Sequence, residues 1–110
     1  VEFALSEAEK ATGLMFRERL ADHGGMLFMW TTSSVRKFWM KNTLINLDIL
    51  FIDSNYRVVH IEKSAKKGSS RIISSILPVK YVLEINAGQS QLRKITPGAL
   101  LSAKNLPICC

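Results

Sequence analysis

The stretch from residue 38 to residue 53 constrains the fold of this chain most strongly. It reads Phe-Trp-Met-Lys-Asn-Thr-Leu-Ile-Asn-Leu-Asp-Ile-Leu-Phe-Ile-Asp, and it places Lys41, Asn42 and Asp48 in a run otherwise apolar enough for a protein core. Ionised side chains are rarely buried without partners, because removing a charge from water is costly. The segment therefore predicts either a functional site or a structural ion pair, and the sequence leaves both open.

The size and composition of the chain are typical of one folded domain. The chain has 110 residues, of which 47 % are hydrophobic and 22 % charged, so we expect a single domain over residues 1–110. No apolar run reaches the ~18 residues of a membrane helix, since Asn46 and Asp48 interrupt the best candidate. We therefore expect no transmembrane segment. Val1 to Leu5 read as a strand rather than an export signal, and whether such a signal precedes them is left open.

The positive charge belongs to the second half of the chain. Residues 1–55 contain six Lys and Arg against seven Asp and Glu, whereas the remainder contains nine against two. The basic residues are densest at Lys63, Lys66, Lys67 and Arg71, and such a cluster can attract phosphate, nucleic acid or an anionic membrane. No aromatic residue alternates with these charges, as it does in single-strand binding surfaces. We therefore expect a solvated loop and no nucleic-acid partner.

Metal-binding residue types are sparse and poorly spaced. Both cysteines, Cys109 and Cys110, end the chain, where they can form neither a disulfide framework nor a spaced metal site. His23 and His60 are isolated, with Asp22 as the one nearby partner. The four methionines are typical core residues, although they also suit a soft metal. We expect no metal site and no cofactor.

Local patterns predict a series of short elements. Ser6 followed by Glu9 is a capping box for a helix, which Gly13 is placed to end. Periodicity and turn residues predict strands over 1–5, 26–30, 37–41, 47–53, 57–63, 80–86 and near 100–103, helices over 7–12 and 89–94, and loops over 31–35 and 64–75. About six short strands with one or two short helices indicate an α+β domain, whose mainly antiparallel sheet curls into a small barrel-like or sandwich structure.

Strand alternation brings two carboxylates toward the interior. Asp48 shares a strand face with Leu50, and Glu84 shares one with Val82, so we expect both acids to have apolar neighbours. Buried carboxylates need donors or cations, and Arg17, Lys41 and Asn42 are the obvious candidates. One interpretation is a structural charge network that fixes the bend at Asn42.

The second interpretation is a small polar pocket with an apolar rim. The candidate ligand-binding residues are Met15, Arg17, Trp39, Met40, Lys41, Asn42, Asp48 and Glu84.

Several motifs in order along the chain resemble one family. They are Gly13-Leu-Met-Phe-Arg17, Gly25-Met-Leu-Phe28, Phe38-Trp-Met-Lys-Asn-Thr43 followed by Leu47-Asp48, Tyr81-Val-Leu-Glu84, and Ala87-Gly88. Together they resemble the bacterial and archaeal family called domain of unknown function 192. The resemblance implies a compact, barrel-like α+β domain with no established activity, often exported in Gram-negative members. Its motif residues here are Gly13, Leu14, Met15, Arg17, Gly25, Met26, Phe38, Trp39, Met40, Lys41, Asn42, Thr43, Asp48, Asp53, Glu84 and Gly88.

The chain departs from the family pattern at three turns. Asn46 stands where proline is common, Asn55 or Tyr56 near a common glycine, and Ala99 where a Gly-Asp pair is common. The first two are tolerable changes of turn chemistry. The third removes a carboxylate, which weakens any site that would use it.

Two classes of function fit these observations. We expect a non-catalytic domain that binds a small molecule or a protein partner and is envelope-associated, either periplasmic or secreted, with a cytoplasmic location as the alternative. The second class is a hydrolase-like enzyme with Asp48 or Glu84 as acid or base, and the Gly-x-Ser-x-Gly, phosphate-loop and His-Glu-x-x-His motifs are missing. We therefore favour binding over catalysis, and the ligand and oligomeric state are left open.

Overall fold

The computed structural model describes residues 1–101 of the chain. Its elements are β1 (Glu2–Ala4), α1 (Glu7–Thr12), β2 (Met26–Ser34), β3 (Lys37–Phe38), β4 (Leu47–Ile52), β5 (Val58–Ala65), β6 (Ile73–Ser74), β7 (Val79–Asn86) and α2 (Gln89–Leu92). The predicted α+β class with a mainly antiparallel sheet is confirmed, with seven strands rather than about six among the described residues.

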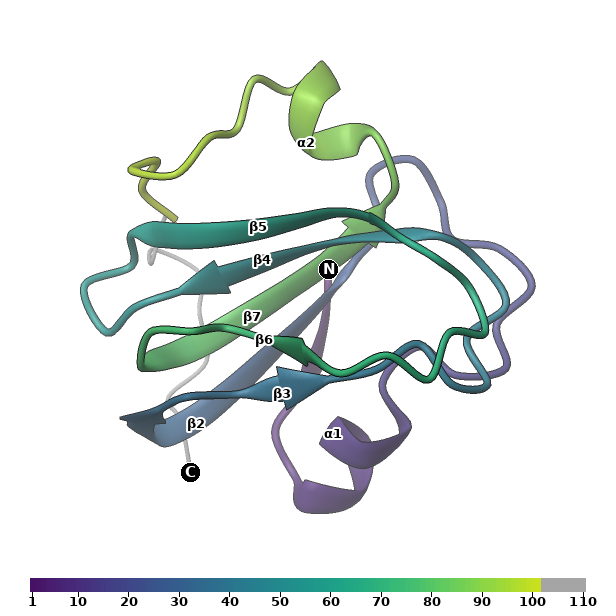
Figure 1. Ribbon diagram of the computed structural model, residues 1–110, viewed down its shortest axis with the longest axis horizontal. Coiled ribbons are helices and arrows are strands. Elements are labelled where there is room, and N and C mark those ends of the chain that lie inside the picture. Colours follow the sequence, from purple (N-terminus) through teal and green to yellow (C-terminus); the bar gives the residue numbers. More distant parts are fainter. Residues whose placement is uncertain (102–110) are drawn as a thin grey trace.

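The strands form one large and one small sheet. The large sheet has the order β1-β2-β7-β4-β5, and β3 pairs with β6 in the small one. All neighbours are antiparallel except β1 and β2. That parallel pair is possible because the chain between β1 and β2, which includes α1, is long enough for a crossover. Figure 1 shows the small sheet in front of the large one, with α1 below and α2 above.

Both faces of the large sheet are covered, which is why all six residues of β4 are buried. One face carries Phe28 and Phe51 and packs against Phe38 of β3 and Ile73 of β6; we call it the β3–β6 face. The opposite face carries Leu50 and Tyr81 and packs against the segment that follows α2, including Ile95, Ala99 and Leu101; we call it the C-terminal face. Alternate residues of each strand therefore enter separate apolar clusters.

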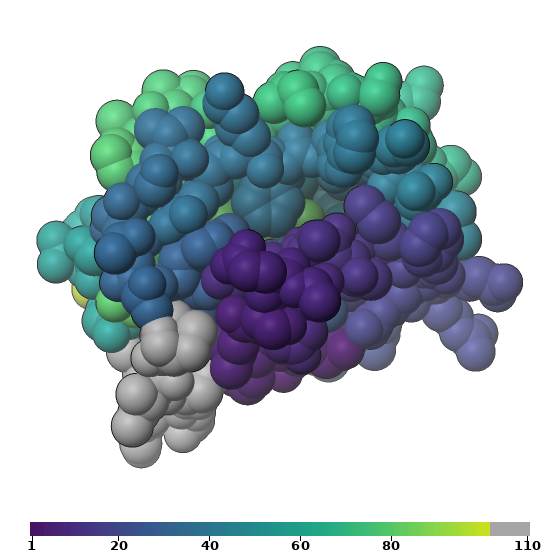
Figure 2. Space-filling view, turned by 90° about the horizontal axis from the view of Figure 1, so that it is seen from below, coloured from purple at the N-terminus to yellow at the C-terminus, as the bar shows by residue number. Residues whose placement is uncertain are grey.

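The helix α1 is held at its start by the predicted capping box. The Ser6 hydroxyl accepts a hydrogen bond from the Glu9 backbone N–H at 3.1 Å, and the Glu9 carboxylate accepts one from the Ser6 N–H at 3.0 Å. Gly13 ends the helix as predicted, with a φ of 50°. No residue of α1 is buried, and Figure 2 shows the helix in purple on the outer surface. The helix is thus a cover on the molecule rather than part of its core.

The predicted bounds of one strand and two loops are wrong. The loop predicted over 31–35 is mostly strand, because β2 continues past a bulge to pair Ser34 with Val79. The strand predicted over 37–41 ends at Phe38, because the Met40 N–H bonds the Ser69 carbonyl and the chain then turns. The loop predicted over 64–75 contains the end of β5 and all of β6.

The predicted final strand is present only as a single bridge between Leu100 and Arg57. Residues 102 and 103 of that strand lie outside the described residues, as do Cys109 and Cys110. Among residues 1–101, no helix has the length and apolar character needed to cross a membrane.

Candidate functional site

A cavity of about 390 Å³ opens beside α1, between that helix, β2 and the segment around β3. Its volume lies in the range of small-molecule sites, roughly 300 to 1,000 Å³. Glu84 of β7 also lines it. The lining residues are Glu7, Lys10, Ala11, Thr12, Gly13, Leu14, Met15, Phe28, Trp30, Val35, Arg36, Lys37, Phe38, Trp39, Thr43 and Glu84.

Aromatic rings form one wall of this cavity. Phe28 and Phe38 meet edge to face with their centroids 5.1 Å apart, and Trp30 meets Phe38 edge to face at 6.3 Å. Edge-to-face contacts of this kind stabilise ring positions beyond simple burial. Phe28 and Trp30 lie two residues apart on β2 and so point to the same side of the sheet. The wall is therefore a fixed surface for a flat or apolar ligand group.

Glu84 is the most unusual group in the cavity. Its side chain is buried, with 5 % of the residue exposed, and it makes no hydrogen bond or ion pair with any other described residue. None of the fully buried side-chain nitrogens and oxygens in residues 1–101 lacks a hydrogen-bond partner. The unpartnered Glu84 oxygens must therefore keep a small contact with the open space of the cavity.

Burial also changes the protonation of Glu84. Desolvation raises its pKa to about 8, because no nearby cation stabilises the charged form. At neutral pH the group is mainly the uncharged acid, which both donates and accepts hydrogen bonds. The cavity therefore ends in a neutral polar group.

A second polar group faces the same space. Thr43 is buried, with 6 % exposed, and its backbone is fixed by the bonds from its N–H to the Met40 carbonyl and from the Gly68 N–H to its own carbonyl. Its hydroxyl makes no hydrogen bond to another side chain or carbonyl within residues 1–101. Glu84 and Thr43 are thus two buried polar side chains left available in the cavity.

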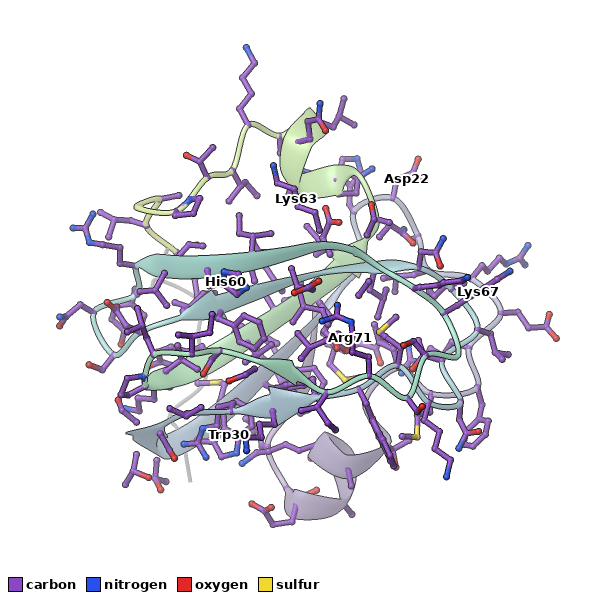
Figure 3. The ribbon with its side chains drawn as sticks, in the orientation of Figure 1. Asp22, Trp30, His60, Lys63, Lys67 and Arg71 are labelled. Carbon is purple, nitrogen blue, oxygen red and sulfur yellow. The ribbon has the colours of Figure 1, made fainter. Side chains whose placement is uncertain are left out.

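Two positively charged side chains lie against the Trp30 ring. The Lys10 Nζ atom lies 4.9 Å from the Trp30 ring centroid, and the Arg36 Cζ atom lies 4.3 Å from it. Both distances suit cation–π attraction. Figure 3 shows Trp30 on the side of the sheet nearest α1. Burial lowers the pKa of Arg36, and the nearby Glu7 charge opposes that shift.

Three of the eight predicted site residues line this cavity: Met15, Trp39 and Glu84. Met40 is 1 % exposed and belongs to the core. Asn42 lies in the left-handed region, with a φ of 60°, and its carbonyl accepts the Phe16 N–H at 2.8 Å. Asn42 thus shapes a turn, as expected for a residue type that tolerates this conformation.

The expectation that Lys41 is a partner of a buried carboxylate is wrong. Lys41 is exposed, and its Nζ atom lies 5.2 Å from the Trp39 ring centroid on the outside of the molecule. The prediction failed because β3 ends at Phe38, so the chain leaves the sheet before Lys41. Strand alternation therefore does not apply to this residue.

Asp48 is buried but fully satisfied by other groups. Its Oδ1 atom accepts the Ser64 N–H at 2.9 Å, and its Oδ2 atom accepts the Gly88 N–H at 3.1 Å, the Ser90 N–H at 3.0 Å and the Ser90 hydroxyl at 2.7 Å. Burial alone would raise the pKa of Asp48, but these hydrogen bonds outweigh it and hold the pKa below its ordinary value. Asp48 therefore ties β4 to β5 and to the start of α2.

The two buried carboxylates lie on opposite faces of the sheet. Across the β4–β7 pair, Ile49 is opposite Glu84 and Asp48 is opposite Ile85, and directly opposed residues share a face. Glu84 is therefore on the β3–β6 face and Asp48 on the C-terminal face. These two acids therefore do not flank one bond, because the sheet separates them.

Arg17 is also engaged elsewhere. Its guanidinium makes two hydrogen bonds to the Glu2 carboxylate, one of them from Nη2 to Oε1 at 2.7 Å. This pair holds the pKa of Glu2 below and that of Arg17 above their ordinary values. Arg17 lines a separate hollow between α1 and β1 rather than the main cavity. Its expected role as a partner of a buried acid is wrong.

The other charged and metal-binding types give no second site. The His23 Nδ1 atom lies 2.6 Å from Arg93 Nη2, and His60 stacks on Phe51. No group of three His, Cys, Asp or Glu suited to a metal is found in residues 1–101. Arg71 pairs with Glu62 at 2.8 Å, and Figure 3 shows Lys63, Lys67 and Arg71 well separated from one another.

Sequence reasoning missed several cavity residues. They are Lys10, Phe28, Trp30, Arg36, Phe38 and Thr43. The available signal was the apolar run of residues 26–30, because strand geometry places Phe28 and Trp30 of that run on the same side of the sheet. The basic residues at the cavity carried no such signal, because stacking on Trp30 depends on contacts distant in sequence.

The comparisons with known proteins agree with this fold. The family model DUF192, described as "Uncharacterized ACR", matches residues 1–103, so the chain belongs to this family. No curated protein matches the chain.

Two crystal structures are similar to it. One, from Sinorhizobium meliloti and described as a "putative transcription regulator", is 40 % identical with a TM-score of 0.90, over 92 % of this chain and 78 % of that one. The other, a protein of unknown function from Novosphingobium aromaticivorans, is 40 % identical with a TM-score of 0.86, over 88 % and 69 %.

Proposed function

We propose that this protein is a non-catalytic binding domain that holds a small ligand in the cavity beside α1. The observation that carries the proposal is Glu84, a buried carboxyl group with no partner in the described chain that opens onto this cavity. An unpartnered buried polar group costs stability. A ligand that hydrogen-bonds Glu84 would remove that cost, whereas the fold alone gives no reason to keep the group.

The arrangement favours binding over hydrolysis. A two-carboxylate hydrolase needs both acids at one bond, and Asp48 lies across the sheet with all its hydrogen-bonding positions used. The other charged residues that line the cavity with Glu84 are Glu7, Lys10, Arg36 and Lys37. The other lining carboxylate, Glu7, has a side chain that is 92 % exposed and is paired with Lys10, whereas Glu84 is buried, so the two do not form a pair of coupled acids.

The chain offers a direct test, because its only two tryptophans, Trp30 and Trp39, both line the cavity. A library of neutral and charged single-ring compounds is screened by NMR for shifts of the two indole N–H signals, assigned with Trp30→Phe. We expect binders to shift these signals in the wild-type protein and to lose affinity at least tenfold in Glu84→Leu. The matched control is Asp53→Leu on the β4–β5 turn, which should bind like the wild type. If no compound moves either indole signal, the proposal fails.

Nucleic-acid binding is a second candidate, raised by the description of the Sinorhizobium meliloti structure. The basic residues after β5 are exposed, but Arg71 is paired with Glu62. Binding through phosphates would weaken steeply with salt. Affinity for single-stranded DNA that falls with salt, and that drops further in Lys66→Met with Lys67→Met, would support this candidate over a small ligand.

We also propose that the domain acts outside the cytoplasm, either in the periplasm or secreted. The support is the family resemblance described above, since family members from Gram-negative bacteria are often exported. Expression of the complete gene with a C-terminal tag, followed by cell fractionation, tests this. Recovery of the protein with cytoplasmic markers would refute it.

A further inference from the structure

The charges around the cavity are unevenly distributed. Glu84, at the inner end, is uncharged at neutral pH, and Thr43 is a neutral hydroxyl. Lys10, Arg36 and Lys37 contribute three cations to the lining, against the single carboxylate of Glu7. The space therefore has a neutral polar end and a positive region beside Trp30.

The positive charge of Lys10 is poorly compensated, although most of its side chain is covered. Its side chain is 9 % exposed, whereas that of its partner Glu7 is 92 % exposed, and their charged atoms are 3.5 Å apart. An ion pair with one end in water contributes little, because solvent screens it. The remaining contact of the Lys10 ammonium is the Trp30 ring. The Lys10 ammonium has already lost most of its contact with water in the folded protein. An anion that enters the cavity would therefore not need to displace much water from this cation.

Arg36 is fixed in place without an acidic partner. Its Nε atom donates to the Val79 carbonyl at 3.4 Å, its Nη2 atom donates to the Thr32 carbonyl, and no ion pair involves it within residues 1–101. Its backbone is held by Ser75, whose hydroxyl accepts the Arg36 N–H at 2.9 Å. The guanidinium thus stands over Trp30 at a set position, where carbonyl oxygens, the ring and the nearby Glu7 charge act on it but no ion pair is formed.

We propose that the cavity takes a small ring-shaped anion, with its acidic group beside Lys10 and Arg36, its ring against the aromatic wall, and a hydroxyl or carbonyl on Glu84. This inference rests on the proposed function and names the class of its ligand. Three observations favour it: the paired cations on Trp30, the edge-to-face rings of Phe28 and Phe38, and the unpartnered group at the inner end. A cationic ligand would meet two uncompensated positive charges and a neutral acid.

The test uses three para-substituted phenols of similar size whose second substituent differs in charge: para-hydroxybenzoate, para-hydroxybenzamide and para-hydroxybenzylamine. At about pH 7 the first is an anion, the second neutral and the third a cation. Dissociation constants come from the shifts of the Trp30 and Trp39 indole signals. We expect the benzoate to bind at least tenfold more tightly than the amide, and the amine to bind most weakly.

Two variants distinguish the effect of a cation in the cavity from the effect of the protein's overall positive charge. Lys10→Met should weaken the benzoate about tenfold and leave the amide unchanged, since Met keeps the helix and the side-chain length. Lys63→Met removes the same charge from an exposed position on β5 and should change neither ligand. Equal loss of benzoate affinity in both variants would overturn the proposal, because it would mean that net charge alone attracts the anion.

A comparison of uridine monophosphate with uridine tests whether the anionic group of the ligand is a phosphate rather than a carboxylate. Tighter binding of the phosphate ester supports the same class of ligand, with phosphate as its anionic group. If amide or amine binds as tightly as the benzoate, the inference fails while the proposed function stands. If none of the five compounds shifts an indole signal but other library members do, the inference alone fails.

Discussion

Asp48 and Glu84 are both buried carboxylates on neighbouring strands, yet their surroundings are opposite. Asp48 accepts four hydrogen bonds on the C-terminal face, and its pKa is held low. Glu84 accepts none from the described chain on the β3–β6 face, and burial raises its pKa to about 8. The difference shows that burial of an acid says little about its role until its partners are known.

The partners decide what each acid does. The donors on Asp48 come from β5 and from the start of α2, so the carboxylate joins segments distant in sequence. Removing it would leave those donors buried and unpaired. The environment of Glu84 offers apolar rings and open space, so the fold gains nothing from its charge. Stability and binding are therefore expected to separate cleanly between these two residues.

The largest expected effect is that of Asp48→Ala on stability. The substitution leaves three backbone N–H groups and the Ser90 hydroxyl without an acceptor, and we expect a loss of about 3–5 kcal/mol in the free energy of unfolding. Asp48→Asn keeps one acceptor oxygen and should lose distinctly less. Urea unfolding followed by tryptophan fluorescence measures both. A midpoint for Asp48→Ala close to that of the wild type would remove the structural role assigned here.

The second prediction concerns Glu84 and pH. The folded protein keeps a proton on Glu84 up to about pH 8, whereas the unfolded chain loses it near the ordinary pKa of 4.5. Stability must therefore fall as pH rises between these values, by about 1.4 kcal/mol per pH unit. Glu84→Gln cannot ionise, so its stability should exceed that of the wild type by about 3 kcal/mol more at about pH 7.5 than at about pH 5.5.

The comparison of wild type and variant at each pH isolates Glu84 from other titrating groups. Asp48 has the opposite sign: its low folded pKa adds stability above the unfolded value, and that stability is lost as pH falls through the folded pKa. Parallel stability curves for the wild type and Glu84→Gln would contradict the buried, unpaired state of Glu84.

The third prediction concerns the crowding next to Glu84. A Cβ atom on Gly13 would lie 3.1 Å from Phe28 Cζ and 3.8 Å from Glu84 Oε1, at a φ of +50°. We expect Gly13→Ala to cost about 1–3 kcal/mol, from backbone strain and contact with the ring. Gly68→Ala is the control, because its φ is +74° but no atom lies within 4 Å of the added carbon. Equal losses in the two variants would mean that the cavity wall yields freely.

The sequence predicted much of this comparison but not its outcome. Strand alternation correctly placed Asp48 with Leu50 and Glu84 with Val82, because a period of two is a local property of an extended chain. It did not reveal that the two faces are opposite in space, which depends on the β4–β7 register. The capping box of α1 was also predictable from local sequence, because its two residues are only three positions apart.

The partners of the charged residues were beyond local reasoning. Lys41 follows Trp39 and Met40, so it resembled a strand residue in a core, but a turn directs it outward. Three of the four donors on Asp48 are backbone groups 16 to 42 residues away, and backbone groups carry no sequence signature. Lys10 and Arg36 approach Trp30 from separate elements. Contacts of this kind become visible only when the topology is known.

The smallest expected effect is at a third carboxylate, Glu2, which is paired but exposed. Its partner Arg17 makes two hydrogen bonds to it, and the two side chains are 48 % and 37 % exposed. Water and salt screen such a pair, so Arg17→Met should change the free energy of unfolding by about 0.5 kcal/mol or less. The same urea unfolding measurement, repeated at high salt, should give an even smaller difference. A loss comparable to that of Asp48→Ala would mean that pairing, rather than burial with full hydrogen bonding, decides the structural weight of an acid in this fold.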